Sequence, residues 1–153
     1  MVEKENLKKR SPMNISIASR LLGVSITIFI LILTIKSELL EKDIIVFQLA
    51  LSIPFLLISM ITNAKIVDLD SLKDYYIPNR ITHSIGVSLI INTVGLLVAN
   101  YTTRYIGIIF FIVTIIMLSF LLYLDFNKRK LYNELLMITL IFFLGFLPAL
   151  TGL

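Results

Sequence analysis

Three aspartates and the single histidine of the chain fall within one short stretch, and they are the side chains best suited to chemistry. Asp68, Asp70 and Asp74 offer the carboxylate oxygens that Mg²⁺ and Ca²⁺ prefer as ligands. His83 follows at the start of an apolar segment. Carboxylates beside a histidine at the depth of lipid head groups would suit metal-dependent hydrolysis or transfer on a phosphorylated lipid. Two lysines and an arginine of the same stretch can neutralise these carboxylates, so a solvated loop of mixed charge is the competing interpretation.

A second set of polar side chains lies within two apolar segments, at helical spacing. Ser84, Ser88 and Asn92 recur every fourth residue and therefore share one face of a helix, as Gln48 and Ser52 do in an earlier segment. Such a face either lines a pore or solute pocket built from several protomers, or forms hydrogen bonds between helices, which contribute about 0.6 kcal/mol each on average in membranes. The predicted pore or packing face consists of Gln48, Ser52, Pro54, Ser84, Ser88 and Asn92.

Residue types that are missing exclude several classes of function. The chain has no cysteine, which excludes disulfide scaffolds, thiolate metal sites and cysteine nucleophiles. The middle of each apolar segment lacks Asp, Glu, Lys, Arg and His, which argues against a proton relay, a voltage sensor or a carboxylate-bound cation site at mid-membrane within one protomer. Glycine-rich phosphate loops and histidine-pair metal motifs are also missing, so we expect no cofactor and no nucleic-acid partner.

The composition of the chain predicts the medium in which these residues are positioned. Of 153 residues, 58% are hydrophobic and 16% are charged, and the mean hydropathy is +0.94. Soluble domains are about 45–50% apolar and about 25% charged, so both values indicate a lipid bilayer. We predict an all-α polytopic membrane bundle in which a basic tail, residues 1–14, precedes one domain, residues 15–153. Its five transmembrane helices are predicted at about residues 15–35, 44–64, 81–99, 104–124 and 131–153.

The distribution of lysine and arginine predicts how the bundle is oriented. Eleven of these residues fall on the side of the N-terminal tail and three on the opposite side. The positive-inside rule then places the N-terminus in the cytoplasm and the C-terminus outside, which we assign to the cell membrane. All six tyrosines fall at predicted span ends, where an amphipathic ring prefers the membrane interface: Tyr75, Tyr76, Tyr101, Tyr105, Tyr123 and Tyr132.

Local features predict how the helices connect and pack. Residues 65–80 are predicted to form the longest connection between spans. Pro54 lies in the middle of the second span, where it removes one backbone donor and should kink the helix. Ser19, Gly23 and Thr27 recur every fourth residue in the first span, and a stripe of small residues lets another helix approach closely.

The segment from Ile77 to Thr82, Ile-Pro-Asn-Arg-Ile-Thr, resembles the Ile-Pro-Asn-x-x-Thr segment of prepilin and preflagellin peptidases. That resemblance implies a membrane aspartyl protease with an aspartate shortly before the segment. The family also uses a Gly-x-Gly-Asp motif for its second catalytic aspartate, and this chain has none. Because one carboxylate cannot carry out the shared-proton chemistry of a pair, we do not transfer the activity. A proline in the first helical turn, followed by the third span, is the physical alternative.

Three hypotheses for function follow. The first is a non-catalytic membrane helix bundle, acting as a subunit of an assembly or as a homo-oligomeric module. The second is a solute or ion pathway lined by the second and third spans of an oligomer. The third is an interfacial metal-dependent enzyme that acts on a lipid through residues 65–83. The expected partners are the lipid bilayer and either further copies of the chain or another membrane protein.

Overall fold

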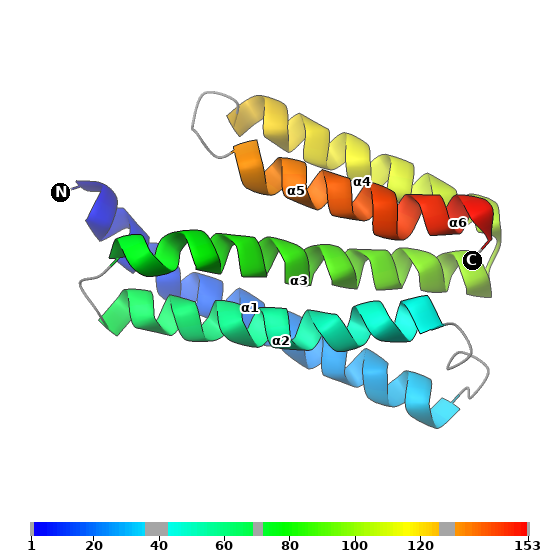
Figure 1. Ribbon diagram of the computed structural model, residues 1–153, viewed down its shortest axis with the longest axis horizontal. Coiled ribbons are helices and arrows are strands. Elements are labelled where there is room, and N and C mark those ends of the chain that lie inside the picture. The colour runs from blue at the N-terminus through cyan, green and yellow to red at the C-terminus, as the bar shows by residue number, and fades with distance from the viewer. Residues whose placement is uncertain (1, 36–42, 69–71, 126–130, 153) are drawn as a thin grey trace.

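The computed structural model describes residues 2–35, 43–68, 72–125 and 131–152, and this part of the chain is almost entirely helical. Three long helices come first: α1 (Val2–Ile35), α2 (Asp43–Asp68) and α3 (Leu72–Tyr101). After α4 (Arg104–Asp125), three segments follow one another without a break, namely α5 (Leu131–Ile141), the π-helix η3 (Phe142–Phe146) and α6 (Leu147–Thr151). The predicted all-helical bundle is confirmed (Figure 1).

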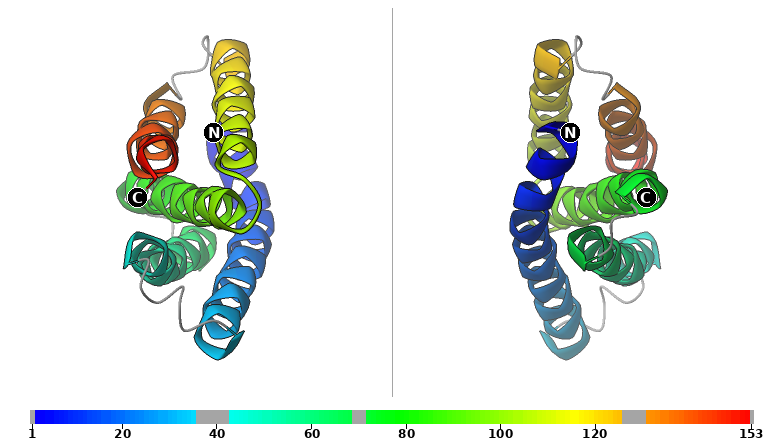
Figure 2. Two further views of the ribbon diagram at one scale, coloured as in Figure 1. Left: turned by 90° about the vertical axis from the view of Figure 1, so that its right-hand side faces the viewer. Right: turned by 90° about the vertical axis from the view of Figure 1, so that its left-hand side faces the viewer.

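Helix α3 lies at the centre of the bundle and contacts every other rod. It packs along α2 on one side and against α4 and the α5–η3–α6 rod on the other, while α1 packs mainly on α2 (Figures 1 and 2). Burial agrees with this order, because 50% of the apolar stretch of α3 is buried and only 11% of that of α4. The two chain termini lie at opposite ends of the bundle (Figure 1).

Four segments are long and apolar enough to cross a membrane. A helix rises about 1.5 Å per residue, so about 20 residues cover a hydrocarbon core of about 30 Å. The four are Ile44–Ile66, Tyr75–Tyr101, Arg104–Tyr123 and Tyr132–Thr151, and α1 adds a shorter apolar stretch, Ile15–Leu31. The chain is therefore a helical membrane bundle, whereas its sidedness and its particular membrane stay predictions.

The third span begins earlier than the sequence predicts, and the prediction of a long connection over residues 65–80 is wrong. Helix α2 continues to Asp68 and α3 begins at Leu72, so only residues 69–71, which lie outside the described part, separate them. Pro78 lies inside α3 rather than in its first turn. A proline at this position removes a single backbone donor. In the same part of the helix, the guanidinium group of Arg80 lies over the ring of Tyr76, with its carbon 5.4 Å from the ring centroid.

The described part of the predicted basic tail, residues 2–14, is helical and continuous with the first apolar stretch. Helix α1 begins at Val2 and runs through residues 2–14, with Pro12 inside it. A proline leaves the other backbone hydrogen bonds of a helix in place, so the basic segment and the apolar stretch form one rod. The cytoplasmic location of residues 1–14 stays a prediction.

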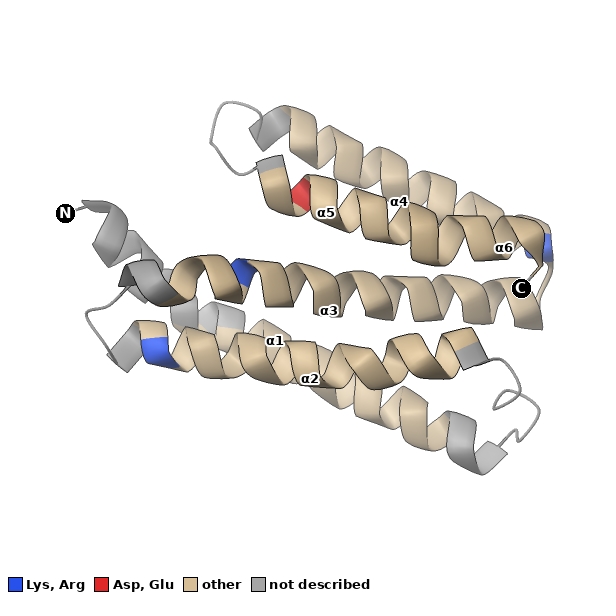
Figure 3. Cartoon of the chain, viewed as in Figure 1, with Lys and Arg blue, Asp and Glu red and all other residues tan. Residues whose placement is uncertain are grey.

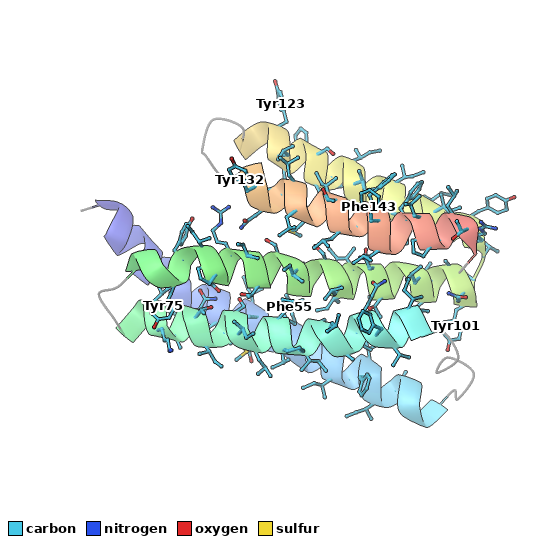
Figure 4. All side chains as sticks on the ribbon, viewed as in Figure 1. Phe55, Tyr75, Tyr101, Tyr123, Tyr132 and Phe143 are labelled. Atoms are coloured by element: carbon cyan, nitrogen blue, oxygen red, sulfur yellow. The ribbon has the colours of Figure 1, made fainter. Side chains whose placement is uncertain are left out.

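The tyrosines stand at the two ends of the bundle, as the sequence predicts. Figure 4 shows Tyr75, Tyr123 and Tyr132 at one end and Tyr101 at the other. Tyr123 and Tyr132 are 77% and 86% exposed, which suits rings that lie in a membrane interface rather than in a core. Charged residues in the described part of the chain also lie toward the ends rather than in the middle of the bundle (Figure 3).

Glycines set the closest approaches inside the bundle. Phe111 of α4 is fully buried, and its ring occupies the space in which a Cβ on Gly95 of α3 or on Gly145 of η3 would lie. Gly107 faces Ala99 so closely that a Cβ there would collide with the Ala99 side chain. The absence of side chains at these three positions brings α4 against α3 and the π-helix.

A methyl group at Gly107 should therefore destabilise the bundle. We expect Gly107→Ala to lower the free energy of unfolding by about 1–3 kcal/mol, because the added carbon overpacks the contact with Ala99. Gly23→Ala is the matched control, since no atom lies within 4 Å of a Cβ at that position, and helix propensity should raise stability there by up to about 1 kcal/mol. Unfolding in mixed micelles with increasing SDS measures both, and equal changes in the two variants would contradict the assigned contact.

Candidate functional site

The acidic residues of the predicted lipid-facing site fall where the structure is not described. Asp70 lies outside the described residues, and the same holds for the side chains of Asp68, at the end of α2, and of Asp74, in the first turn of α3. No group of three or more potential metal-ligating side chains occurs in the described part of the chain. The metal-dependent site therefore stays a prediction.

His83 is half-buried in α3 and belongs to a cluster of polar side chains between α2 and α3. This cluster, called the amide cluster below, consists of Ser59, Thr62 and Asn63 of α2 with Asn79 and His83 of α3. Asn79 is 7% exposed, and Asn63 is 2% exposed. The cluster is thus an interior feature of the bundle, although it lies near the end at which α2 and α3 are connected (Figure 1).

Two asparagines form the centre of the amide cluster. Asn63 Nδ2 donates to Asn79 Oδ1 at 2.9 Å, and Asn79 Nδ2 donates back to Asn63 Oδ1 at 2.9 Å. Each primary amide thereby uses one donor and one acceptor on the other. This reciprocal pairing satisfies both groups without water. Polar side chains buried in a membrane require such partners within the protein.

Hydroxyl groups complete the amide cluster. Ser59 Oγ lies 3.0 Å and Thr62 Oγ1 lies 3.1 Å from Asn79 Oδ1, so this oxygen is richly supplied with donors. Ser59 Oγ also lies 3.4 Å from His83 Nδ1. A serine beside a histidine is a possible nucleophile. Here Ser59 is fully buried and shares its hydroxyl with an amide, so the arrangement favours a role in holding the helices together.

Sequence reasoning missed this cluster, although its signals are present. Ser59 and Asn63 are four residues apart in α2, and Asn79 and His83 are four residues apart in α3, so each pair shares a helix face. The sequence instead places Asn79 in the connection before the third span, because Pro78 indicates the start of a helix. Its role follows once α3 begins at Leu72.

A second polar contact joins α2 and α3 to the α5–η3–α6 rod. Gln48 Nε2 donates to the backbone carbonyl of Leu144 at 2.6 Å, and Asn92 Nδ2 donates to that of Leu140 at 3.2 Å. Gln48 is 1% exposed, and Asn92 is fully buried. We call these four residues the junction, since they fasten the two sides of the bundle to one another across α3.

Pro148 explains one half of the junction. A proline has no N–H, so the carbonyl four residues earlier, that of Leu144, loses its α-helical donor. The side chain of Gln48 supplies that donor from another helix. The π-helix also changes the hydrogen-bond register here, with the N–H of Leu147 donating to the carbonyl of Phe142, five residues earlier.

The predicted pore or packing face is buried, with one exception. Ser52, Ser84 and Ser88 lie inside the bundle with Gln48 and Asn92, which supports packing between helices. Pro54 is exposed within the protomer, so its inclusion in this face stays a prediction. Two residues correspond to about 200° around a helix with 3.6 residues per turn, which carries Pro54 to the side opposite Ser52.

A cavity of about 160 Å³ lies at the end of the bundle that carries the C-terminus, apart from both polar clusters. Arg104 at the start of α4 donates through Nε to the carbonyl of Ala149 at 2.9 Å. Gly152 ends α6 in the left-handed region, with φ 82°. A cation at a helix C-terminus interacts favourably with the helix dipole, so Arg104 acts as a cap for α6. The cavity is lined by Leu96, Ala99, Asn100, Arg104, Pro148, Ala149 and Gly152.

No protein-family model, no curated protein and no solved structure matches the chain. The resemblance of residues 77–82 to a peptidase segment thus rests on those residues alone. In the structure, these residues lie within helix α3 rather than in a loop before it.

Removing one amide of the cluster should cost more than removing both. Asn79→Leu removes the amide that bonds to Asn63, Ser59 and Thr62, and we expect it to lower the free energy of unfolding by about 1–2 kcal/mol. The double variant Asn63→Leu, Asn79→Leu should recover part of this loss, because both amides are then replaced by an apolar pair of similar size.

Unfolding in mixed micelles measures these variants. Asn100→Leu serves as the control, since its exposed amide bonds only to its own helix, at the carbonyl of Leu96. Strictly additive losses in the double variant would contradict the reciprocal pairing.

Proposed function

We propose that the protein is a non-catalytic membrane module that associates with a second copy of itself through the exposed small-residue face of α1. The observation that carries the proposal is Gly23, which meets no atom within 4 Å of where a Cβ would be placed. Ser19 and Thr27, one turn to either side, are exposed as well.

The other helical glycines of the bundle support this reading by contrast. At Gly86, Gly95, Gly107 and Gly145, a Cβ would come within 3.0 Å of a neighbouring helix, so each glycine permits one close contact inside the protomer. Gly23 also lies within an apolar helix, but no atom of a neighbouring helix would contact a Cβ at this position. In lipid, helices associate mainly through close packing of small residues, since the hydrophobic effect provides little drive between them.

The inner face of α1 is already used, which leaves the small-residue stripe free for a partner. Ala18 and Ser25 are fully buried where α1 packs on α2. Ser25 Oγ donates to the carbonyl of Leu21 at 2.9 Å, and Thr27 Oγ1 donates to that of Gly23 at 2.8 Å. These two hydroxyls are thus satisfied within the helix, so association does not depend on them for hydrogen bonds.

The interior of the bundle supports a non-catalytic role. Most described polar side chains there bond to another helix or to their own backbone, as the amide cluster illustrates. Gln48 Oε1 and Asn92 Oδ1 are different, because neither has a partner in the described part of the chain. These two oxygens favour the solute or ion pathway as the second candidate function.

Added bulk on the stripe tests the proposal. We expect Gly23→Ile to weaken self-association by about tenfold or more, equivalent to about 1.4 kcal/mol, because a branched side chain would keep the second helix at a distance. Sedimentation equilibrium in detergent, or energy transfer between labelled copies in liposomes, measures the association.

Val24→Ile is the matched control, because Val24 is exposed on α1 but lies off the stripe. Its association should equal that of the wild type. An unaltered oligomer for Gly23→Ile, or a wild type that is monomeric at every protein-to-lipid ratio, would contradict the proposal.

A further inference from the structure

We propose that the junction of α2, α3 and η3 binds a monovalent cation through uncharged oxygen atoms. The inference goes beyond self-association through α1 and rests on Gln48, Asn92 and the backbone around the π-helix. Both amides direct their nitrogen toward a carbonyl of the α5–η3–α6 rod, which leaves Gln48 Oε1 and Asn92 Oδ1 buried without a hydrogen-bond donor among the described residues.

Two unpartnered acceptors at this depth require an explanation. Burying a polar group without a partner costs about 1–3 kcal/mol in proteins, and lipid offers no water to offset it. Rotating either amide would not help, because its oxygen would then face the carbonyl oxygen of Leu140 or Leu144. The amides therefore keep their nitrogens on the backbone, and the oxygens need a positive group from elsewhere.

The register of α2 against α3 brings the two oxygens to nearly the same level. The helices run antiparallel, and three contacts fix their alignment: Asn63 with Asn79, Ser59 with His83, and the Leu56 side chain with Gly86. Continued along both helices, this alignment sets Gln48 beside residues 93–95, within a turn of Asn92. Their acceptors, Leu140 and Leu144, are likewise one helical turn apart.

The hydroxyl groups near this level have already committed their protons. Ser52 Oγ donates to the carbonyl of Leu49, Ser88 Oγ to that of Ser84, and Thr93 Oγ1 to that of Leu89, at 2.7–2.9 Å. All three side chains are fully buried. Among the polar side chains at this level, oxygen acceptors therefore outnumber free donors, while the apolar core side chains Leu49, Leu96 and Phe111 pack beside them.

The backbone adds to this excess of acceptors. Pro148 deprives the Leu144 carbonyl of its α-helical donor, and the π-helix shifts the bonding of the residues before it. In membrane proteins, interrupted helices expose carbonyl oxygens that coordinate desolvated cations, and rings of uncharged carbonyls suffice for K⁺.

The charge of the ligand follows from the charge of the site. No Asp, Glu, Lys, Arg or His lies in the middle of the spans. Divalent ions such as Ca²⁺ and Mg²⁺ are bound with carboxylates, which are missing here, so uncharged amide and carbonyl oxygens favour Na⁺, K⁺ or NH₄⁺.

Thermal unfolding of the full chain in detergent tests the site. Circular dichroism is recorded in NaCl, KCl or NH₄Cl and in choline chloride at equal ionic strength, because choline is too large for the junction. We expect a saturable rise in Tm with at least one small cation. The rise should disappear in Gln48→Met and in Asn92→Leu and persist in Thr62→Val, a control within the amide cluster.

A second variant keeps the proposal testable where the apolar variants do not fold. Asn92→Asp keeps the shape of the side chain and adds a negative charge, so half-saturation should move to a cation concentration at least tenfold lower. Equal Tm values of the wild type in all four salts would overturn the proposal and leave an internal water as the partner of the two oxygens. A rise that is unaltered in every junction variant would also overturn it, because the cation would then bind elsewhere.

Discussion

Every polar group in the middle of this bundle must find its partner within the protein, since hydrocarbon supplies none. The clearest case is Pro148, whose missing N–H leaves the Leu144 carbonyl without an α-helical donor. The Gln48 side chain satisfies that carbonyl from α2 at 2.6 Å. A defect in one helix thereby becomes a contact between two, and it fixes how far α2 can lie from the α5–η3–α6 rod.

The same constraint makes α3 the organising helix. Its two buried asparagines face different neighbours: Asn79 pairs with Asn63 of α2, and Asn92 bonds to Leu140 of the α5 rod. Each contact specifies a rotation and a register, which apolar packing alone defines poorly. Between them, glycines bring the backbones close, with Gly86 against Leu56 of α2 and Gly95 against Phe111 of α4. Polar pairs thus set alignment, and small residues set distance.

Much of this architecture could be predicted from the sequence, because the lengths and ends of the spans depend on the thickness of the bilayer. Apolar length and tyrosine position locate the spans α2 to α5 closely, since both respond to bilayer thickness. The start of α3 could not be predicted in this way. Pro78 follows polar residues and indicates a helix start, whereas the helix begins at Leu72, because a single missing donor costs less than ending a helix that neighbouring rods support.

The polar clusters were predictable in kind and not in detail. Spacing placed Ser52, Ser88 and Asn92 on helix faces, and these faces are buried. Spacing within one helix cannot identify a partner on another, so the pairing of Asn63 with Asn79 required the antiparallel register. The π-helix carries no periodic signal in the sequence, although Gly145 lies within it and Pro148 follows it by two residues.

Two outward faces of the bundle differ in a way that bears on what covers them. The outer face of α4 presents large side chains, among them Ile109, Ile116 and Phe120, each more than half exposed. Flexible lipid chains adapt to such a surface at little cost, because its bulges leave no narrow groove. The face of α1 around Gly23 instead carries the small side chains of Ser19 and Thr27, with open space where a Cβ on Gly23 would lie. A lipid chain would have to lose conformational freedom to pack closely there, whereas a second helix is already ordered. Glycines make the close contacts inside the protomer, and the same principle favours a contact between protomers at Gly23, the one glycine of the described apolar helices at which a Cβ would meet no neighbour.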